Sequence, residues 1–338
     1  MKRIDDPEIL PDARAAQTHV VILDGTLSSL REGCETNAGL LYKLLQESGA
    51  NRSVYYEPGI QWNGWRTTRS VLTGLGINRM IRRAYGALAS RYRPGDRIFL
   101  FGYSRGAYAV RSLAGVIDRV GLLRPEAATP RHLRDIYRHY QMAPDSESAQ
   151  AFARAHCYDS TEIEMVGVWD TVKALGIRAP IIWRFSEPAH AFHSHALGNS
   201  IRHGFHALAL DETRNAYAPV LWRCRSDFPG VIEQVWFRGA HGDIGGQLSR
   251  LESARGLSNI PLVWMLERAE RCGLSFPADW RLRFPVNPDA PSVGSWRGWG
   301  KFFWSRSRRT IGLDASESLH ASVDRPHLAE EFSTENSC

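Results

Sequence analysis

A serine between two glycines is the first residue in this sequence whose surroundings favour chemistry. Ser104 lies in Gly-Tyr-Ser-Arg-Gly at 102–106, which matches the GxSxG pattern in full. An apolar run at 97–101 predicts a strand before it, and apolar spacing at 107–117 predicts a helix after it. Such a strand–turn–helix exposes the serine hydroxyl as a nucleophile. The alternative is a tight turn in which the serine only caps the helix.

A nucleophilic serine needs an imidazole to take its proton and a carboxylate to orient that imidazole. Asp170 directly follows the apolar run 164–169, and His241 follows the apolar run 234–237 within a glycine-rich segment. The chain order Ser, Asp, His is that of α/β-hydrolases. We therefore expect Ser104, Asp170 and His241 to form a catalytic triad. Four other residues stay open as alternatives for the base or the acid: His203, His206, Asp211 and Asp243.

Backbone N–H groups near the serine are expected to stabilise the oxyanion of an acyl-transfer reaction. The N–H of Arg105, at the start of the predicted helix, is one expected donor. The backbone of Gly25 and Thr26, after the apolar run 19–23, is the second. A plain strand-ending turn capped by Asp24 is the alternative there.

The same turn, Asp-Gly-Thr at 24–26, also ends the DxDGT motif of haloacid-dehalogenase phosphatases. The first aspartate of that motif is the phosphoryl acceptor. Ile22 stands in its place here. The sequence therefore disfavours a phosphatase that uses Asp24.

Alternating strands and helices are the elements that must position these residues. Apolar runs predict strands at 19–23, 53–56, 97–101, 164–169 and 234–237. Helical spacing of apolar residues predicts helices near 36–45, 77–92 and 107–117. This alternation predicts an α/β fold with a mostly parallel, doubly wound sheet of the α/β-hydrolase type, whose functional groups gather at the carboxyl ends of the strands.

The length of 338 residues fits one large domain with insertions. We expect a catalytic domain over 15–280. Insertions at about 124–160 and 174–205 are predicted to form a helical cap or lid. Residues 281–338 are predicted to be a C-terminal extension that packs on the domain.

Composition excludes several classes of protein. The 43% hydrophobic and 23% charged fractions are typical of a globular chain. The net charge of +6 is compatible with an anionic partner but is also common without one. The five scattered cysteines favour a reducing, cytoplasmic compartment over a disulfide framework. The sequence shows neither a secretory signal nor an apolar run long enough to span a membrane.

Two clusters lie outside the expected triad. The segment from Trp296 to Arg309 mixes aromatic and basic residues, as membrane-interface segments do. Peripheral membrane contact is one interpretation, and a core-packing helix is the other. Nucleic-acid binding is not expected, because no nucleic-acid-binding motif accompanies the cluster. Acyl transfer needs no metal or cofactor and none is expected, although one group of histidines has ligand character: His190, His193, His195, His203 and His206.

Seven sequence words, in order, match a known family. The chain resembles the bacterial DUF2235 α/β-hydrolases, which include Tle1-type phospholipase effectors of the type VI secretion system. The resemblance implies a serine esterase or lipase acting on lipid or phospholipid acyl esters, with Ser104, Asp170 and His241 as its triad. It also implies a secretion-system or immunity protein as partner, and type VI export without a signal peptide. The matching words are residues 23–26, 36–37, 102–107, 167–172, 206–212, 235–246 and 319–323.

The chain departs from the family pattern in two ways. It ends soon after the catalytic unit, whereas the large effectors carry a long additional membrane-docking module. Its histidine loop reads His-Gly-Asp-Ile-Gly-Gly-Gln at 241–247 rather than His-Ser-Asp-Val-Gly-Gly-Gly. Both departures keep open a rival interpretation, a non-catalytic binding or regulatory protein that retains the fold.

Overall fold

The computed structural model describes residues 14–47, 49, 51–59, 75–172, 196–296 and 304–323. Within these ranges, seven strands form one sheet in the order β2-β1-β3-β4-β5-β6-β7, and every neighbouring pair is parallel. The strands are β1 (Thr18–Leu23), β2 (Arg52–Glu57), β3 (Arg97–Tyr103), β4 (Ile163–Trp169), β5 (Ile201–Ala209), β6 (Val231–Phe237) and β7 (Glu317–Leu319). The predicted α/β fold with a parallel sheet is confirmed.

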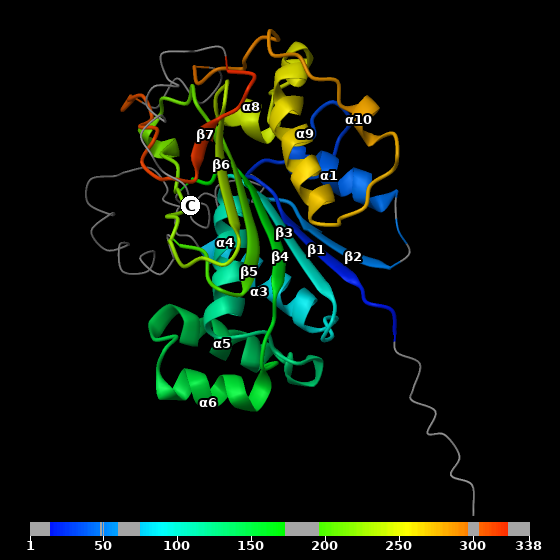
Figure 1. Ribbon diagram of the computed structural model, residues 1–338, viewed down its shortest axis with the longest axis vertical. Helices are drawn as coiled ribbons and strands as arrows, with labels where there is room; N and C mark the ends of the chain where they lie inside the picture. Colours follow the sequence, from blue (N-terminus) through cyan, green and yellow to red (C-terminus); the bar gives the residue numbers. More distant parts are fainter. Residues whose placement is uncertain are drawn as a thin grey trace, which may run out of the picture.

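Helices cover both faces of the sheet (Figure 1). On one face α3 (Leu75–Ala89) and α4 (Arg105–Arg119) pack against the strands in one hydrophobic core. On the other, α1 (Asn37–Gln46) and α9 (Arg255–Arg271) pack in a second core. The sheet is therefore doubly wound, as predicted.

The continuous apolar run of β1 follows from this arrangement. Val21 and Leu23 belong to the core under α4, whereas Val20 and Ile22 belong to the core under α1. Successive side chains of a strand point to opposite faces, so a strand buried on both faces needs apolar residues at every position.

The sequence did not predict two of the strands, β5 and β7. β5 carries His203 and His206, and its histidines break the apolar run that marks the other central strands. Residues 201–205 of the predicted 174–205 insertion therefore belong to the sheet. Residues 173–195 lie outside the described residues.

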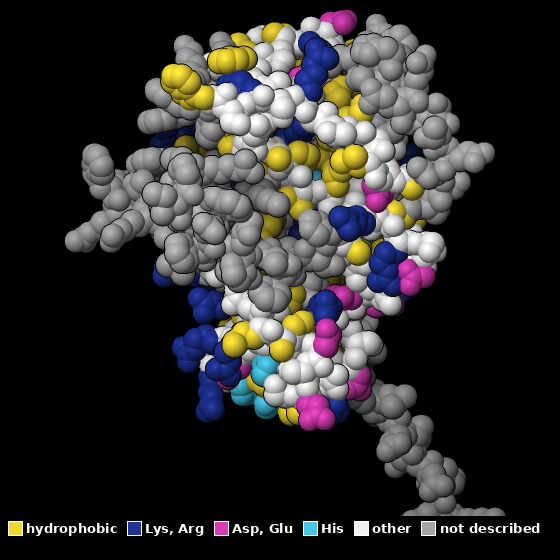
Figure 2. Space-filling model, turned by 90° about the vertical axis from the view of Figure 1, so that its left-hand side faces the viewer, with side chains coloured by type: hydrophobic (Ala, Val, Ile, Leu, Met, Phe, Trp, Pro, Cys, Tyr) yellow, Lys and Arg dark blue, Asp and Glu magenta, His cyan; other side chains and the backbone are white. Residues whose placement is uncertain are grey.

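The helices of the predicted 124–160 insertion lie away from the site. α4 starts at the carboxyl end of β3 and runs back along the sheet, so α5 (Pro130–Met142) and α6 (Glu147–His156) follow at the opposite end (Figure 1). An antiparallel bridge between Leu123 and Cys157 closes the segment there. Arginine and histidine side chains gather over this end of the molecule (Figure 2). The prediction that 124–160 forms a cap over the site is therefore wrong in this structure.

The C-terminal part adds a strand and short connections. β7 extends the sheet beside β6, where Ser318 pairs with Val235.

Cys224 is disulfide-bonded, which differs from the expectation of reduced cysteines, while Cys34, Cys157 and Cys272 are free thiols. No helix in the described ranges is long and apolar enough to cross a membrane. The shorter helical elements are η1 (Pro125–Ala127), η3 (Asn215–Tyr217), α8 (His241–Gly245), η4 (Glu252–Ala254) and α10 (Trp280–Arg283).

Candidate active site

Ser104 occupies the sharp turn between β3 and α4. Its backbone has φ 57° and ψ −119°, a strained conformation for a residue with a side chain. A Cβ on Gly106 would lie 2.0 Å from the Leu23 carbonyl oxygen, and one on Gly102 would lie 2.7 Å from the Ala107 backbone nitrogen. The two glycines of the motif therefore permit the close approach of α4 to β1 and β3. The Ser104 hydroxyl makes no capping hydrogen bond to the helix, so the helix-cap alternative is not observed.

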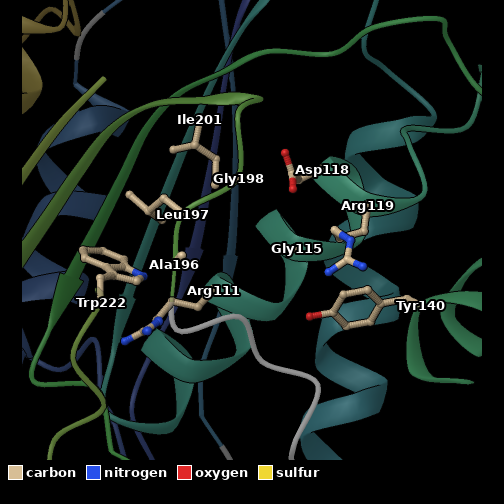
Figure 3. Close-up of a pocket in the computed structure, with 10 residues that line it drawn as sticks. All are labelled: Arg111, Gly115, Asp118, Arg119, Tyr140, Ala196, Leu197, Gly198, Ile201 and Trp222. Atoms are coloured by element: carbon tan, nitrogen blue, oxygen red, sulfur yellow. The ribbon is translucent and has the colours of Figure 1, made fainter. Parts of the chain in front are cut away.

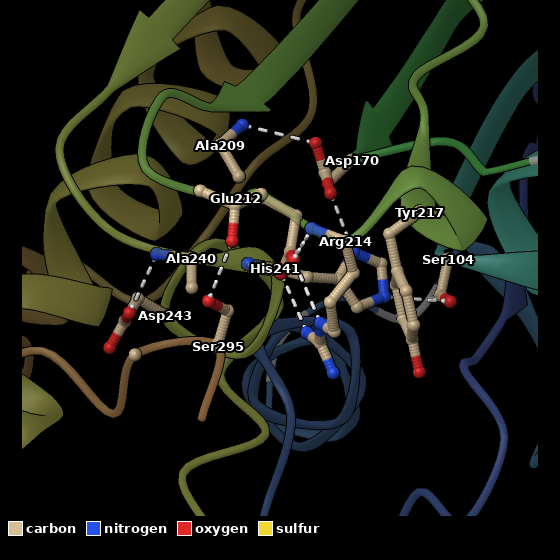
Figure 4. Close-up of polar contacts among 12 residues, drawn as sticks. Ser104, Asp170, Ala209, Glu212, Arg214, Tyr217, Ala240, His241, Asp243 and Ser295 are labelled. Atoms are coloured by element: carbon tan, nitrogen blue, oxygen red, sulfur yellow. Dashed lines mark hydrogen bonds and ion pairs between the residues drawn. The ribbon is translucent and has the colours of Figure 1, made fainter. Parts of the chain in front are cut away.

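The structure brings Ser104, His241 and Asp170 together (Figure 4). Ser104 Oγ lies 2.9 Å from His241 Nε2, and His241 Nδ1 lies 2.5 Å from Asp170 Oδ2. The serine follows β3, the aspartate follows the adjacent β4, and the histidine opens α8 after β6. The serine hydroxyl thus contacts the imidazole, and the imidazole contacts a carboxylate, which is the arrangement that a nucleophile, a base and an orienting acid require.

The alternative histidines are engaged elsewhere. His206 Nε2 lies 3.1 Å from the Thr171 N–H, from which it accepts a hydrogen bond. Burial lowers the pKa of His206 to about 3, which keeps the ring neutral. His203 Nδ1 lies 2.9 Å from the Glu164 carbonyl oxygen. Neither contact leads to Ser104.

The alternative acids hold the loop that carries His241. Asp211 Oδ2 accepts the Gly239 N–H at 2.7 Å. Asp243 accepts the N–H of Ala240 at 2.8 Å and that of Val293 at 2.8 Å. Both carboxylates therefore shape the backbone around the histidine rather than contact its ring.

Asp170 is fully buried, yet it is surrounded by donors. Its Oδ1 accepts the Ala209 N–H at 3.0 Å, and the Arg309 guanidinium binds both carboxylate oxygens, at 2.5 and 2.9 Å. Burial alone would raise the pKa of Asp170, but the charge of Arg309 and the hydrogen bonds from His241 and Arg309 hold it well below its usual range. The Asp170 carboxyl is therefore an anion at neutral pH.

The predicted oxyanion donors lie beside the serine, with one difference. Arg105 is the first residue of α4, so its N–H has no partner within the helix. A Cβ on Gly25 would lie 3.4 Å from Ser104 Cβ, which places the turn after β1 next to Ser104. The Gly25 N–H, however, donates to Asp24 Oδ1 at 2.6 Å. The prediction of Gly25 as an oxyanion donor is therefore wrong, because Asp24 takes up its N–H, whereas Thr26 as a donor stays a prediction.

The Asp24 side chain stabilises that turn through hydrogen bonds. Its Oδ2 accepts the hydroxyls of Thr36 at 2.6 Å and Tyr56 at 2.7 Å. Burial raises the pKa of Asp24 to about 6, against the opposing effect of these hydrogen bonds. These contacts agree with the alternative interpretation of the sequence, in which Asp24 caps a strand-ending turn.

Two tyrosines enclose the His241 ring. Tyr103 lies at 4.9 Å between ring centroids and Tyr217 at 4.8 Å, the latter edge-on. The His241 backbone N–H donates to Glu212 at 3.2 Å, and Glu212 forms a bidentate ion pair with Arg214. Sequence reasoning did not assign a role to these residues. Tyr103 and Glu212 had a signal in the sequence, since they lie in the family words at 102–107 and 206–212.

The Trp296–Arg309 cluster divides into separate parts. Trp296 and Trp304 are exposed, by 63% and 90%. The Arg306 guanidinium lies 3.6 Å from the Trp296 ring centroid. Arg309 is buried on Asp170, so including it in a membrane-facing surface was wrong. Residues 297–303 lie outside the described residues.

No metal centre is formed by the residues that the structure describes, in which no group of three or more His, Cys, Asp or Glu side chains is placed to hold an ion. His190, His193 and His195 lie outside them. A small cavity of about 20 Å³ lies elsewhere, between α4, α5 and the start of β5 (Figure 3). Arg111 lines it, donates to the Val220 carbonyl and lies over the Trp222 ring. The cavity has room for about one water and is not part of the triad site.

Residues 17–268 match the family model of the type VI secretion system phospholipase effector Tle1-like catalytic domain. The chain belongs to this family. It is also 30% identical, over 340 aligned positions, to the uncharacterized protein YEL023C of Saccharomyces cerevisiae, a match that covers 91% of this chain and 46% of the yeast protein.

Two solved structures are similar at lower identity. One is the Tle1 effector bound to the VgrG spike from the Type 6 secretion system, with 20% identity, a TM-score of 0.38, and coverage of 69% of this chain and 52% of that one. The other is an uncharacterized protein from Pseudomonas aeruginosa, with 15% identity, a TM-score of 0.44, and coverage of 80% and 49%. The chain spans about half the length of the relatives it matches.

Proposed function

We propose that this protein is a serine hydrolase that cleaves carboxylic esters of lipids or phospholipids through Ser104, His241 and Asp170. The observation that carries the proposal is the chain of contacts from Ser104 Oγ to His241 Nε2 at 2.9 Å and from His241 Nδ1 to Asp170 Oδ2 at 2.5 Å. Membership of the Tle1-like family supports the lipid substrate class.

The reaction proceeds through an acyl-enzyme. Ser104 Oγ attacks the ester carbonyl carbon while His241 Nε2 takes its proton, and Asp170 holds the opposite ring nitrogen. The N–H groups of Arg105 and Thr26 stabilise the oxyanion. The alcohol leaves with the proton from His241. A water molecule then attacks the acyl-enzyme, gives its proton to His241, and releases the acid and the serine hydroxyl.

The proposal extends to location and partners. The exposed Trp296 and Trp304 support peripheral contact with a lipid surface, because aromatic rings favour the membrane interface. Family membership supports export by the type VI route and contact with a secretion-system protein. An immunity protein that blocks the site would be the second expected partner.

Labelling with a fluorophosphonate tests the proposal directly, since the probe reacts only with an activated serine. We expect the wild-type protein to be labelled at Ser104 and to hydrolyse both a short-chain ester and phospholipid vesicles. Ser104→Ala should abolish labelling and lower kcat by at least about 10³-fold. Ser90→Ala, at an exposed serine after α3, should match the wild type.

Two outcomes would contradict the proposal. Hydrolysis that persists at full rate in Ser104→Ala would remove the mechanism. A wild-type protein that neither reacts with the probe nor hydrolyses any ester would favour the rival function, a binding protein that keeps the fold. Faster turnover of vesicles than of the short-chain ester would assign the substrate class to lipids.

A further inference from the structure

A buried arginine reaches the triad from the C-terminal segment. Arg309 lies outside residues 17–268, the range that the family model matches, and its side chain is 5% exposed. Its Nη1 donates to Asp170 Oδ1 at 2.5 Å, and its Nη2 donates to Asp170 Oδ2 at 2.9 Å. The same two nitrogens donate to the carbonyl oxygens of Ala209, at 2.8 Å, and Tyr217, at 2.5 Å. One guanidinium thus links the ends of β4, β5 and η3 behind the triad.

The contacts suit a guanidinium and no other side chain. Arginine presents its N–H groups in a flat, rigid fork that matches the two oxygens of a carboxylate. A lysine ammonium has the charge but not the fork. Asp170 Oδ2 contacts both His241 Nδ1 and Arg309 Nη2, so the arginine fixes the same carboxylate oxygen that the histidine contacts.

The backbone presents Arg309 from two anchored points. Before it, the Ser307 N–H donates to the Thr213 carbonyl at 2.9 Å. After it, β7 pairs with β6, and the Cys224 N–H donates to Asp314 at 2.8 Å. Among the ion pairs of the described residues, those of Asp170 are with His241 and Arg309. The segment 304–323 therefore delivers the cation that pairs with the catalytic carboxylate.

We propose that Arg309 is a positioning residue of the triad, which fixes the orientation and negative charge of Asp170 and so makes the C-terminal segment part of the active site. The inference rests on the proposed hydrolase function. It predicts a second effect beyond geometry. Without the guanidinium the buried Asp170 carboxyl loses its cationic partner, so the pKa of Asp170 rises and its negative charge is lost at a higher pH than in the wild type.

Arg309→Met and Arg309→Lys test the inference, with Arg308→Met at the exposed neighbour as the matched control. Kinetics are measured on a short-chain ester from pH 4 to 9, with active sites counted by fluorophosphonate. We expect Arg309→Met to lower kcat per active site about 100-fold with little change in KM, as for a misplaced catalytic group. The acid limb of its pH profile should move to higher pH. Arg309→Lys should recover part of kcat and keep the acid limb near that of the wild type, and Arg308→Met should match the wild type throughout.

A purely structural role gives a different result. If Arg309→Met lowers only the melting temperature or the number of active sites, and the remaining sites keep the wild-type kcat and pH profile, the inference is overturned. If Arg309→Met does not fold, an Arg309→Lys variant with wild-type kcat and an unmoved proton resonance would overturn it.

A readout that needs no activity separates this inference from the proposed function. The proton on His241 Nδ1, in its short contact with Asp170, should give a far-downfield NMR signal in the wild type. Loss or displacement of that signal in Arg309→Met supports the positioning role even if no ester is hydrolysed. An unchanged signal contradicts it, whatever the outcome for Ser104→Ala.

Discussion

Two buried carboxylates follow the strands on either side of β3, which leads to Ser104, and their pKa values are shifted in opposite directions. Asp24 follows β1 and Asp170 follows β4, the two neighbours of β3 in the sheet. Both are buried, with 1% and 0% of the residue exposed. Burial raises the pKa of Asp24 to about 6, whereas the pKa of Asp170 is held well below its usual range.

The difference lies in the partners rather than in the burial. Asp24 receives neutral donors, the hydroxyls of Thr36 and Tyr56 and one backbone N–H. Asp170 receives a guanidinium as well. Neutral donors only partly offset the rise in pKa that burial causes in a carboxylate. A neighbouring cation lowers the pKa below its ordinary value. The acid of a Ser-His-Asp triad must stay charged to stabilise the imidazolium, and Asp170, with its guanidinium partner, meets this requirement better than Asp24.

The largest difference between Asp24 and Asp170 should be in the effect of their substitution on kcat. Asp170→Asn should lower kcat by about 10⁴-fold, because an amide does not hold His241 in the tautomer that accepts the serine proton. Asp24→Asn should lower kcat by no more than about 10-fold, since Asp24 supports the turn without contacting the triad. The two variants are compared on a short-chain ester, with melting temperatures as a check on folding. Equal losses would mean that Asp24 takes part in the chemistry.

The second effect is on stability as a function of pH. The folded-state pKa of Asp24 lies above its ordinary value of 3.8, so the native state binds the proton more tightly than the unfolded chain. Between about pH 4 and pH 6 this group should therefore lower stability as the pH rises, by roughly 3 kcal/mol in all. Asp170, with a lowered pKa, acts in the opposite direction and only below about pH 4.

Urea unfolding of wild type and Asp24→Asn at pH 4, 5, 6 and 7 measures this slope. We expect the two curves to diverge, with the variant gaining stability relative to the wild type as the pH rises. Asp289→Asn, at an exposed carboxyl, should run parallel to the wild type. Parallel curves for Asp24→Asn as well would show that the carboxyl keeps an ordinary pKa in the folded protein.

The residues around Asp170 also differ in how far the sequence predicts their positions. Ser104, Asp170 and His241 each follow an apolar strand, and strand ends of a parallel sheet meet at one edge, so their proximity can be inferred from spacing. Arg309 contacts Asp170 across 139 residues, from a segment whose tryptophans and arginines resemble a surface. No local pattern distinguishes a buried arginine from an exposed one. The same holds for β5, whose buried His206 interrupts the apolar run, and for α5 and α6, whose helical pattern does not indicate which end of the sheet they cover.

The smallest effect concerns a single hydroxyl on the Asp24 side. Thr36 Oγ1 donates to Asp24 Oδ2 at 2.6 Å and accepts the Gly39 N–H at 2.9 Å as the N-cap of α1. Thr36→Val removes both bonds, whereas Thr36→Ser keeps them. Loss of the cap should cost about 1 kcal/mol at every pH. Loss of the donor should raise the pKa of Asp24 further, so the deficit of Thr36→Val against Thr36→Ser should be larger at pH 7 than at pH 4, where Asp24 is protonated. A deficit that does not change with pH would mean that the hydroxyl serves the helix alone, and that the charge on Asp24 depends on its other donors.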